Sequence, residues 1–372
     1  MTVPFRDLKR LHEIGRDSSR SRLESALDSA TFARPNQWIE DFEASYADYC
    51  GVDHAVATAS GTAALMLTYL ALGIGPGDEV VTAANTFVAT IEPALALGAT
   101  VRLADVDPET HLMSQEAALA LVTPRTKAIV PFHAYGRLAD LSLLRRETSR
   151  LGITLVEEAC HAPGATRNGR MAGSFGDCAV FSFGPTKPLA GLGEGGAVVT
   201  NDSQLALRLR RWNDHGRTGG EHLEIGLNFR MHPMEAAYLT ERLKLLPEFL
   251  EERRALAHVY NDAFAPYGVV KNPDVTDYSA HSYYVYVLDV PERRRFTELL
   301  TEHGIGWDIH YPRAIYELPA HQKMFADLDF ANCSALQRRI VSLPMITGLT
   351  ELERNQVVSC VCDALAEVSP DH

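Results

Sequence analysis

The sequence has no excess of basic residues and no long apolar run. Its 35 Lys and Arg residues are outnumbered by 48 Asp and Glu residues, and the net charge at pH 7 is −13. This balance argues against nucleic-acid binding, which needs a basic face. No apolar run approaches the roughly 20 residues of a membrane-spanning helix, and the first residues lack the apolar core of a signal peptide. We therefore expect neither a nucleic-acid partner nor a membrane anchor.

Cysteine is also sparse. The six cysteines are scattered through 372 residues, and no two of them form a C-x-x-C pair. In a chain of this size, scattered thiols are typical of reduced residues in a cytoplasmic protein, and we expect no metal site. Hydrophobic residues make up 46% of the chain and charged residues 22%. This composition is typical of a soluble globular protein, and the length is sufficient for two domains.

Apolar, strand-like runs alternate with helical segments from residue 54 onward. The runs cover residues 54–59, 78–84, 100–106, 126–132, 153–159 and 178–183. Alternation of this kind predicts an α/β fold, in which a largely parallel sheet carries helices on both faces. Such sheets bind ligands at the carboxyl ends of their strands. The residues that directly follow each run are therefore the candidate site residues.

A long charged helix is predicted beyond the alternating part, over residues 235–260, with an interruption at Pro247. We place a domain boundary at this interruption. It divides the chain into a large domain of residues 1–247, which begins with an extended arm, and a smaller α+β domain of residues 248–372. Strands are predicted in the smaller domain over residues 281–290 and 305–311.

One lysine, Lys187, lies in a loop of Gly, Pro and Thr between the strand-like runs 178–183 and 196–200. An amine that forms a Schiff base with a carbonyl cofactor must be held rigidly and kept partly desolvated. Desolvation lowers the pKa of the amine, so that the neutral, nucleophilic form is available. The ordinary alternative is an exposed loop lysine. The Schiff-base interpretation of Lys187 therefore depends on the residues found at the ends of the other strands.

Two other strand ends carry residues suited to a phosphate or an aromatic ring. Ser60-Gly61-Thr62 closes one strand and opens a helix, where free backbone N–H groups form a phosphate cup, although a simple N-cap is the alternative. Ser182 is a second candidate phosphate donor, or else an inward-facing strand serine. Phe87 follows the next strand and is placed to lie flat against a ring, although core packing is the usual fate of Phe.

Two adjacent acids, Glu157 and Glu158, end a further apolar strand. Because side chains alternate faces along a strand, one acid can point into the site while the other faces away. A carboxylate here can keep a pyridinium nitrogen protonated, so that the ring remains an electron sink. A solvated turn acid is the alternative. His161, three residues beyond Glu158, is suited to a hydrogen bond with a ring hydroxyl, or is a surface histidine.

The run Gly191–Gly196 matches the dinucleotide fingerprint G-x-G-x-x-G. That fingerprint follows a strand and opens a helix, whereas this run precedes the strand-like segment 196–200. We interpret the glycines as a tight turn in the loop that carries Lys187. The match therefore does not indicate a nicotinamide-dependent dehydrogenase.

Together, these stretches resemble the sugar aminotransferases of the DegT/DnrJ/EryC1/StrS family, a branch of the fold-type I pyridoxal-phosphate enzymes. The matching stretches occur in family order and at family spacing from about residue 50 to the end, and they include SGTAAL (60–65), NTFVAT (85–90), ITLVEEACHAPGA (153–165), GSFGDCAVFSFGPTK (173–187), GLNFRM (226–231) and GIGWDIHYP (304–312). The resemblance implies an aspartate aminotransferase-like fold with a large, mostly parallel-sheet domain and a smaller C-terminal domain.

The resemblance also implies roles for individual residues. Lys187 would bind pyridoxal 5′-phosphate covalently and move the proton during transamination. The cofactor contacts it implies are Gly61, Thr62, Phe87, Glu158, His161, Ser182 and Asn228, and the substrate contacts are Arg230, His310, Tyr311, Tyr316 and His321. Asn228 would come from a neighbouring subunit, which implies a homodimer with shared active sites. Glu158 is a departure, because the family usually has Asp there, and Glu is one methylene longer.

The implied reaction is a two-stage transamination. Glutamate would convert the cofactor to its pyridoxamine form, which then aminates a nucleotide-linked keto-6-deoxyhexose in an antibiotic, lipopolysaccharide or glycan pathway. The Gly193–Gly196 run favours a 4-keto over a 3-keto sugar, by association alone. A cyclitol aminotransferase or an aminohydroxybenzoate-type dehydratase would share these residues. A sugar 3-dehydratase usually has His in place of Lys187, and a non-enzymatic sensor would not need the complete cofactor set.

Overall fold

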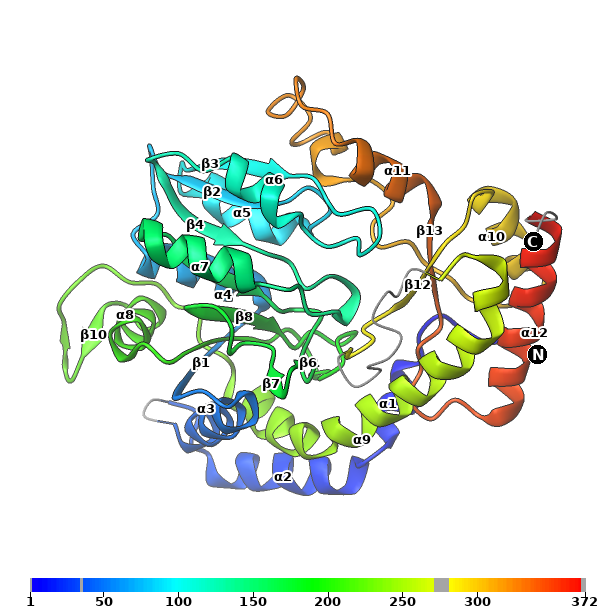
Figure 1. Ribbon diagram of the computed structural model, residues 1–372. Coiled ribbons are helices and arrows are strands. Elements are labelled where there is room, and N and C mark those ends of the chain that lie inside the picture. The colour runs from blue at the N-terminus through cyan, green and yellow to red at the C-terminus, as the bar shows by residue number, and fades with distance from the viewer. Residues whose placement is uncertain (1, 34–35, 271–280, 369–372) are drawn as a thin grey trace.

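A seven-stranded sheet forms the centre of the computed structural model, which describes residues 2–33, 36–270 and 281–368 (Figure 1). The strand order is β1-β9-β8-β5-β4-β2-β3. Neighbouring strands are parallel, except that β9 is antiparallel to both β1 and β8. This arrangement confirms the predicted α/β fold with a mostly parallel sheet. The strands are β1 (His54–Thr58), β2 (Glu79–Ala83), β3 (Thr100–Ala104), β4 (Thr126–Val130), β5 (Thr154–Glu158), β8 (Cys178–Ser182) and β9 (Gly196–Thr200).

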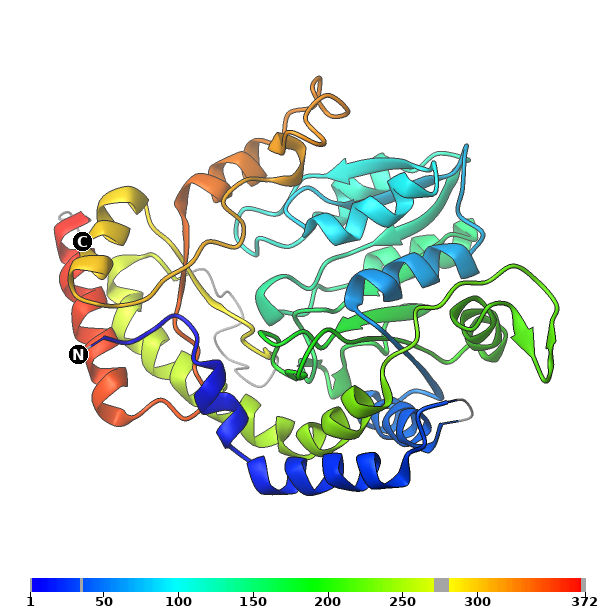
Figure 2. The ribbon, with the colours of Figure 1, turned by 180° about the vertical axis from the view of Figure 1, so that it is seen from behind.

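Helices cover both faces of this sheet, with α6 and α7 in front in Figure 1 and α4 and α5 in front in Figure 2. Along β8, Val180 packs in the core on one face, while its neighbours Ala179 and Phe181 pack in the core on the other. Burial on both faces explains why these strands read as nearly continuous apolar runs. The helices are α4 (Gly61–Ala71), α5 (Val88–Ala96), α6 (Gln115–Ala120), α7 (Ser142–Leu151) and α8 (Ser203–Asn213).

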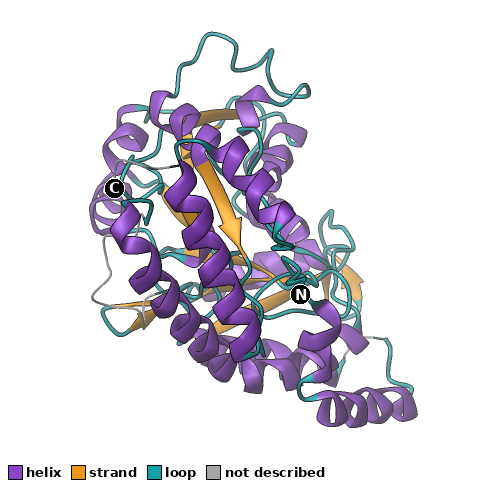
Figure 3. Ribbon diagram, turned by 90° about the vertical axis from the view of Figure 1, so that its right-hand side faces the viewer, coloured by secondary structure: helices purple, strands orange, loops and turns teal. Residues whose placement is uncertain are grey.

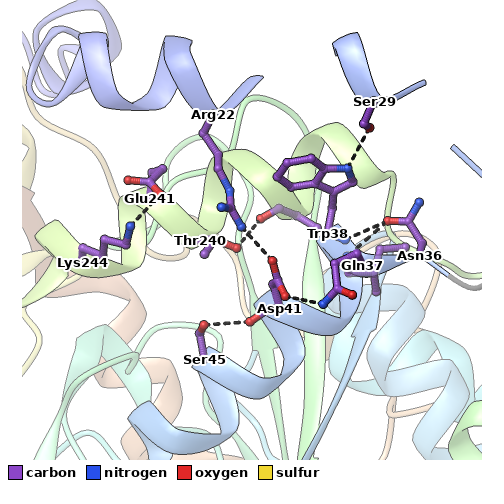
Figure 4. Close-up of polar contacts among 12 residues, drawn as sticks. Arg22, Ser29, Asn36, Gln37, Trp38, Asp41, Ser45, Thr240, Glu241 and Lys244 are labelled. Atoms are coloured by element: carbon purple, nitrogen blue, oxygen red, sulfur yellow. Dashed lines mark hydrogen bonds and ion pairs between the residues drawn. The ribbon is translucent and has the colours of Figure 1, made fainter. Parts of the chain in front are cut away.

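The N-terminal helices pack beside the sheet against the long helix α9. These elements are α1 (Leu8–Glu13), α2 (Arg16–Ser29), α3 (Gln37–Cys50) and α9 (Pro233–Phe264). Figure 4 shows Arg22 of α2 reaching Asp41 of α3, with 2.9 Å between the two side chains. The same guanidinium lies 4.6 Å from the ring centroid of Trp38. Asn36 caps α3 by accepting the backbone N–H groups of Trp38 and Ile39.

Helix α9 is continuous through Pro247, so the predicted interruption is wrong. Proline removes one backbone donor and normally breaks a helix. Here Leu246 and Phe249 on either side are almost fully buried, and their packing keeps the helix in one piece. Because α9 crosses the predicted boundary, the division into residues 1–247 and 248–372 remains a prediction.

The C-terminal part of the chain forms a second core around a two-stranded antiparallel sheet. The elements of this part of the chain are α10 (Arg293–Glu302), α11 (Ala331–Arg339), α12 (Glu351–Val368), β12 (Tyr286–Asp289) and β13 (Ile340–Leu343), and of these α11 packs instead on the core of the large sheet through Cys333 and Leu336. Leu288 and Leu343 pack in the second core with Phe264 of α9 and Val361 of α12. Figure 3, viewed from this end, shows helices in front with the strands behind them. Of the strand predicted over residues 281–290, only the part Tyr286–Asp289 is a strand, namely β12.

The strand predicted over 305–311 is not a strand. This segment makes single bridges instead, between Ile305 and Val3 and between Asp308 and Ser342. A side chain at Gly306 would lie 2.2 Å from the backbone nitrogen of Phe5. The segment therefore runs in direct backbone contact with the N-terminal arm, which occupies the space that a neighbouring strand would need.

Short elements complete the described residues. They are the hairpins of β6 (Thr166–Arg167) with β7 (Arg170–Met171) and of β10 (Arg217–Thr218) with β11 (Glu221–His222), and the 3-10 turns Ala134–Gly136, Ala265–Tyr267 and Ile315–Glu317. Among the residues that the structure describes, no helix combines the length and apolar character needed to cross a membrane. The same residues contain no group of three or more His, Cys, Asp or Glu side chains arranged to hold a metal ion.

An ion pair fixes α1 to the start of α12, and we expect it to make stability depend on pH. Arg10 donates to both carboxylate oxygens of Glu353, at 2.9 and 2.8 Å. This hydrogen bonding lowers the pKa of Glu353 from 4.5 to about 2. A carboxyl whose pKa is lower in the folded state stabilises the fold above its unfolded pKa, and that contribution is lost as pH falls from about 4.5 toward 2.

Glu353→Gln should therefore lower the free energy of unfolding at pH 7 by about 1–2 kcal/mol, and by much less near pH 2. Urea titrations at both pH values measure the difference. Glu351→Gln is the matched control, because Glu351 is 81% exposed and lies 3.8 Å from its partner Arg354. An equal loss of stability for Glu353→Gln at both pH values would contradict the ion-pair explanation.

Candidate active site

A cavity of about 490 Å³ lies at the carboxyl ends of the strands. The strands β1, β2, β4, β5 and β8 all end at this cavity, as expected for a parallel sheet. The segment that follows α10 closes the opposite side. The predicted site residues that line the cavity are Gly61, Thr62, Phe87, Glu158, His161, Ser182, Lys187, His310 and Tyr311.

The first turn of α4 forms one end of the cavity. The Ser60 side chain caps the helix by accepting the Ala63 N–H at 3.0 Å, so the N-cap interpretation of Ser60 is correct. The N–H groups of Gly61 and Thr62 precede the first helical hydrogen bond and are available to an anion. A Cβ atom at Gly61 would lie 2.8 Å from the Cβ of Ser182. Only glycine lets β8 and α4 approach so closely.

Glu158 is the acid of the pair that faces the cavity. Its side chain is buried, and one oxygen accepts the Cys160 N–H at 3.2 Å. The other oxygen, Oε2, is buried and has no hydrogen-bond partner. Burial raises the pKa of Glu158, while the hydrogen bond from Cys160 and the charge of Lys187 act against this rise. A buried carboxylate oxygen without a partner in the protein is available to a donor from a ligand.

Glu157 faces the opposite side of β5 and is fully occupied by the protein. It accepts the backbone N–H groups of Gly173, Phe175 and Gly176 and lies 3.0 Å from His133 Nε2. Burial acts to raise its pKa, but the hydrogen bond and charge of His133 and these N–H donors lower it overall. Glu157 therefore holds the loop that leads into β8, and it has no free oxygen for a ligand.

His161 is a buried, neutral ring at the wall of the cavity. Burial lowers its pKa well below the usual range, and the nearby positive charge of Lys187 acts in the same direction. Nδ1 accepts the Tyr135 N–H at 3.3 Å, so the ring proton lies on Nε2, 3.3 Å from the Tyr311 hydroxyl. The ring stacks on Tyr284 at 4.0 Å between centroids. It can therefore donate one hydrogen bond into the cavity.

Lys187 extends from its loop to the face of the Tyr284 ring. Its Nζ lies 4.6 Å from the ring centroid. The loop is held at its far end by buried Glu235, which accepts the N–H groups of Leu192 at 2.9 Å and Gly193 at 3.1 Å. The glycines between residues 191 and 196 thus serve this turn and open β9, as the sequence predicts, and they form no helix N-terminus.

The side of the cavity opposite the sheet carries His310 and Tyr311. The Tyr311 ring lies 5.4 Å from that of Phe87, which is 47% exposed. Burial lowers the pKa of His310 to about 4, so the ring is neutral at pH 7. Its Nδ1 lies 2.9 Å from the Ser342 hydroxyl and its Nε2 lies 3.1 Å from Arg6.

Sequence reasoning missed Arg6 and Tyr284, which both line the cavity. Arg6 lies in an arm with no periodic pattern, so no local signal could have found it. Tyr284 lies inside the run interpreted as a strand, and only the real start of that strand at Tyr286 frees Tyr284 for the site.

Four predicted residues lie outside this cavity. Asn228 and Arg230 line a second cavity with Phe32 and His215, and Arg230 forms an ion pair with Asp214. The Tyr316 hydroxyl lies 2.8 Å from that of Ser334, and His321 lies 3.5 Å from Glu92. The structure does not bring these four side chains to the Lys187 cavity within the chain, so their roles remain predictions.

The family model of the DegT/DnrJ/EryC1/StrS aminotransferase family matches residues 14–362. The chain belongs to this family. It is therefore a sugar aminotransferase that depends on pyridoxal phosphate.

Two relatives of this aminotransferase are named for nucleotide sugars. One is the dTDP-3-amino-3,4,6-trideoxy-alpha-D-glucose transaminase of Micromonospora megalomicea subsp. nigra, 38% identical over 88% of this chain and 90% of that protein. The other is the UDP-N-acetyl-3-dehydro-alpha-D-glucosamine 3-aminotransferase of Acidithiobacillus ferrooxidans, 35% identical over 96% and 97%. The solved structure of DesV from S. venezuelae, in complex with a ketimine intermediate, superposes with a TM-score of 0.91 at 34% identity and covers 98% of both chains.

The cavity fits the cofactor of the family. Pyridoxal phosphate carries a phosphate, a ring nitrogen and an aldehyde, and each group finds a suitable partner among the lining residues. The open first turn of α4 would suit the phosphate, and Lys187 would supply the amine. The unpartnered Oε2 of Glu158 is the strongest sign, because a protonated ring nitrogen is the donor that this oxygen lacks.

Proposed function

We propose that this aminotransferase transfers the amino group of glutamate to a nucleotide-linked keto-6-deoxyhexose. The observation that carries the proposal is the meeting of Lys187, the unpartnered carboxylate oxygen of Glu158 and the open helix N-terminus of α4 in one cavity. The names of the two relatives support a keto sugar joined to a nucleotide as the acceptor. We further propose a cytoplasmic enzyme of amino-sugar biosynthesis, because all six cysteines are unpaired thiols.

The carbon that receives the amino group has two candidates. A 3-keto sugar is supported by the relatives, which are named for 3-amino and 3-dehydro sugars. A 4-keto sugar, expected from the Gly193–Gly196 run, is the second candidate. That run turns around Glu235, with the N–H groups of Leu192 and Gly193 on its carboxylate. Apart from Glu194, which lines the cavity, it offers no physical reason for a choice of carbon.

The bound cofactor would supply an electron sink for the carbon that gains or loses a proton. The first turn of α4 and Ser182 would hold its phosphate, and Glu158 would hold its ring nitrogen protonated. The Nε2–H of His161 would donate a hydrogen bond to a ring oxygen, since Nδ1 already accepts the Tyr135 N–H. Phe87 would cover one face of the ring, because its own side chain is half exposed at the cavity.

Lys187 would move the proton between the substrate carbon and the cofactor. Its amine lies over Tyr284, and this aromatic wall excludes water from one side of it. One positioned lysine can serve both halves of the reaction, because each half needs a proton removed at one carbon and returned at another. His310 and Tyr311 would contact the sugar from the opposite wall.

We also propose that two chains share each active site. Asn228 and Arg230 line a second cavity of their own chain, close to exposed apolar residues. Phe32 is 46% exposed, Leu223 is 59% exposed and Ile225 is 80% exposed. Phe32 lines the same cavity as Asn228, and Leu223 and Ile225 lie shortly before Asn228 in the sequence; exposed apolar side chains near one another favour contact with another protein. A homodimer would cover them and could bring Asn228 and Arg230 to the Lys187 cavity of the partner.

Subunit exchange tests the shared site. Lys187→Ala and Arg230→Ala should each be nearly inactive, and a mixture that exchanges subunits should recover up to about a quarter of wild-type activity. One site of each heterodimer then draws its lysine and its arginine from unmutated positions. Mixing Lys187→Ala with the double variant should recover nothing. Tagged heterodimers that form and stay inactive would rule out a shared site.

A spectroscopic screen tests the proposed reaction. The protein in its pyridoxamine form is mixed with nucleotide-linked 3-keto sugars, 4-keto sugars and a cyclitol ketone, and the return of the pyridoxal absorbance is followed. A keto-sugar that restores the absorbance supports the proposal and identifies the carbon. Restoration by the cyclitol ketone alone would point to a cyclitol aminotransferase. Binding of nucleotide sugars with no absorbance change would point to a sensor.

A further inference from the structure

The N-terminal arm carries a guanidinium into the active-site cavity. The arm is fixed to the segment after α10, since the Val3 N–H donates to Gly304 at 2.9 Å and the Gly306 N–H donates to Val3 at 2.7 Å. Three residues beyond Val3, Arg6 lines the cavity together with Lys187. The two backbone bonds determine where this side chain lies, so its position is a property of the folded arm.

The positive charge of Arg6 is not neutralised by an acid. Its Nη2 donates to the Tyr284 hydroxyl and to His310 Nε2, both at 3.1 Å, and neither partner is a carboxylate. Among the described residues, no carboxylate lies within ion-pair distance of Arg6. Asp308 also lines the cavity, but it lies 3.9 Å from His310, and its Oδ1 accepts the Ile309 N–H.

Arg6 also has unused donors. Both of its hydrogen bonds come from Nη2, and the N–H groups at Nε and Nη1 have no acceptor among the described residues. A guanidinium with free N–H groups is the residue type that best matches a carboxylate or a phosphate. Arg6 and Lys187 are the two Arg or Lys side chains in the described lining of the cavity.

Arg6 and the amine of Lys187 both lie close to the ring of Tyr284. The guanidinium carbon of Arg6 lies 5.6 Å from the centroid of Tyr284, and Lys187 Nζ lies 4.6 Å from it. A small molecule whose anion contacts Arg6 would therefore have its neighbouring atoms close to the lysine. A donor amino acid has this layout, because its amino group and its carboxylates are only a few bonds apart.

We infer that Arg6 binds a carboxylate of the amino donor and determines specificity in the first half of the reaction. The inference rests on the proposed function, in which an amino acid is the donor. The keto sugar has no anion next to its carbonyl carbon, whereas the donor has a carboxylate next to the carbon that carries its amino group. The hydrogen bonds to Tyr284 and His310 hold the guanidinium in place without pairing its charge with a carboxylate.

Half-reactions of the cofactor-loaded protein test this assignment. L-Glutamate is mixed with the wild type and with Arg6→Met, and the loss of pyridoxal absorbance is followed at increasing glutamate concentrations. Arg6→Met should raise the half-saturating concentration about 10- to 100-fold with a smaller effect on the limiting rate, and Arg6→Lys should lose less. Lys9→Met, which removes an exposed charge from the same N-terminal region, should behave as the wild type.

Donor analogues distinguish a binding role of Arg6 from a merely structural one. A structural role would not change how the half-saturating concentration depends on the carboxylates of the donor. Glutamine lacks the side-chain carboxylate and isoglutamine lacks the α-carboxylate. In the wild type, one of the two analogues should have a higher half-saturating concentration than glutamate. The ratio of these two concentrations should equal the factor by which Arg6→Met raises the half-saturating concentration of glutamate. With Arg6→Met, that analogue and glutamate should saturate alike, because the residue and the carboxylate form one contact.

The outcomes separate this inference from the proposed function. If glutamate saturates the wild type and Arg6→Met equally, while Arg6→Met weakens only the reaction with the nucleotide-linked sugar, Arg6 binds the diphosphate and the inference is wrong. If glutamate does not convert the wild-type cofactor at all, the donor in the proposed function is wrong as well. Should Arg6→Met fail to fold with cofactor, Arg6→Lys against the same two analogues decides the question.

Discussion

Lys187→Ala is expected to abolish turnover while the protein keeps its fold and its cofactor. Nζ of Lys187 lies over the Tyr284 ring in the cavity, and among the described residues its side chain makes no hydrogen bond or ion pair on which the fold could depend. Without it, nothing remains in place to move the proton, and the rate should fall at least about 10³-fold. The phosphate and ring-nitrogen contacts would still bind the cofactor. Steady-state assays, together with absorbance before and after borohydride reduction, measure both effects.

Lys127→Ala is the matched control for this experiment. Lys127 is exposed on β4, so its loss should leave the rate and the covalent attachment unchanged. Lys244 is occupied by an ion pair with Glu241, 2.6 Å away. Lys271 lies outside the described residues. A Lys187→Ala protein that still formed a reducible bond with the cofactor would mean that another lysine is the anchor.

Glu158→Gln should bind the cofactor but lose most of its activity, by about 10²- to 10³-fold. The amide cannot stabilise a protonated ring nitrogen as a carboxylate does, and without that proton the ring is a poor electron sink. Glu158→Asp should retain more activity, because it keeps the charge. The measurements are the rate with glutamate and the pH dependence of the cofactor absorbance. Glu158→Gln should change that pH dependence, whereas Glu158→Asp should not.

Glu157→Gln is the contrasting variant, because the two acids are neighbours with different surroundings. Glu157 receives three backbone N–H groups and the His133 ring, all on the side of β5 that faces away from the cavity. Its replacement should lower the thermal midpoint and leave the catalytic rate of the folded protein nearly unchanged. If Glu157→Gln instead lost the rate and Glu158→Gln kept it, Glu157 would be the partner of the ring nitrogen.

The sequence by itself predicted the strands of the central sheet and the residues that end them. Alternating apolar and helical segments are a local property, and both faces of the central strands are buried, so the pattern is clear. Parallel strands place their carboxyl ends at one edge, so Gly61, Glu158 and Lys187 could be expected to meet before any contact was known. They do line one cavity.

Only the tertiary structure decided the features that depend on distant contacts. Glu157 and Glu158 are equivalent in the sequence, and their roles separate because different elements pack on the two faces of β5. Packing on both sides of Pro247 keeps α9 continuous where the local rule predicts a break. Arg6 meets His310 across 304 positions of the chain, through an arm that pairs with an irregular segment. Such contacts leave no periodic pattern in the sequence, because the position of each of these residues depends on packing against residues that are distant in the chain.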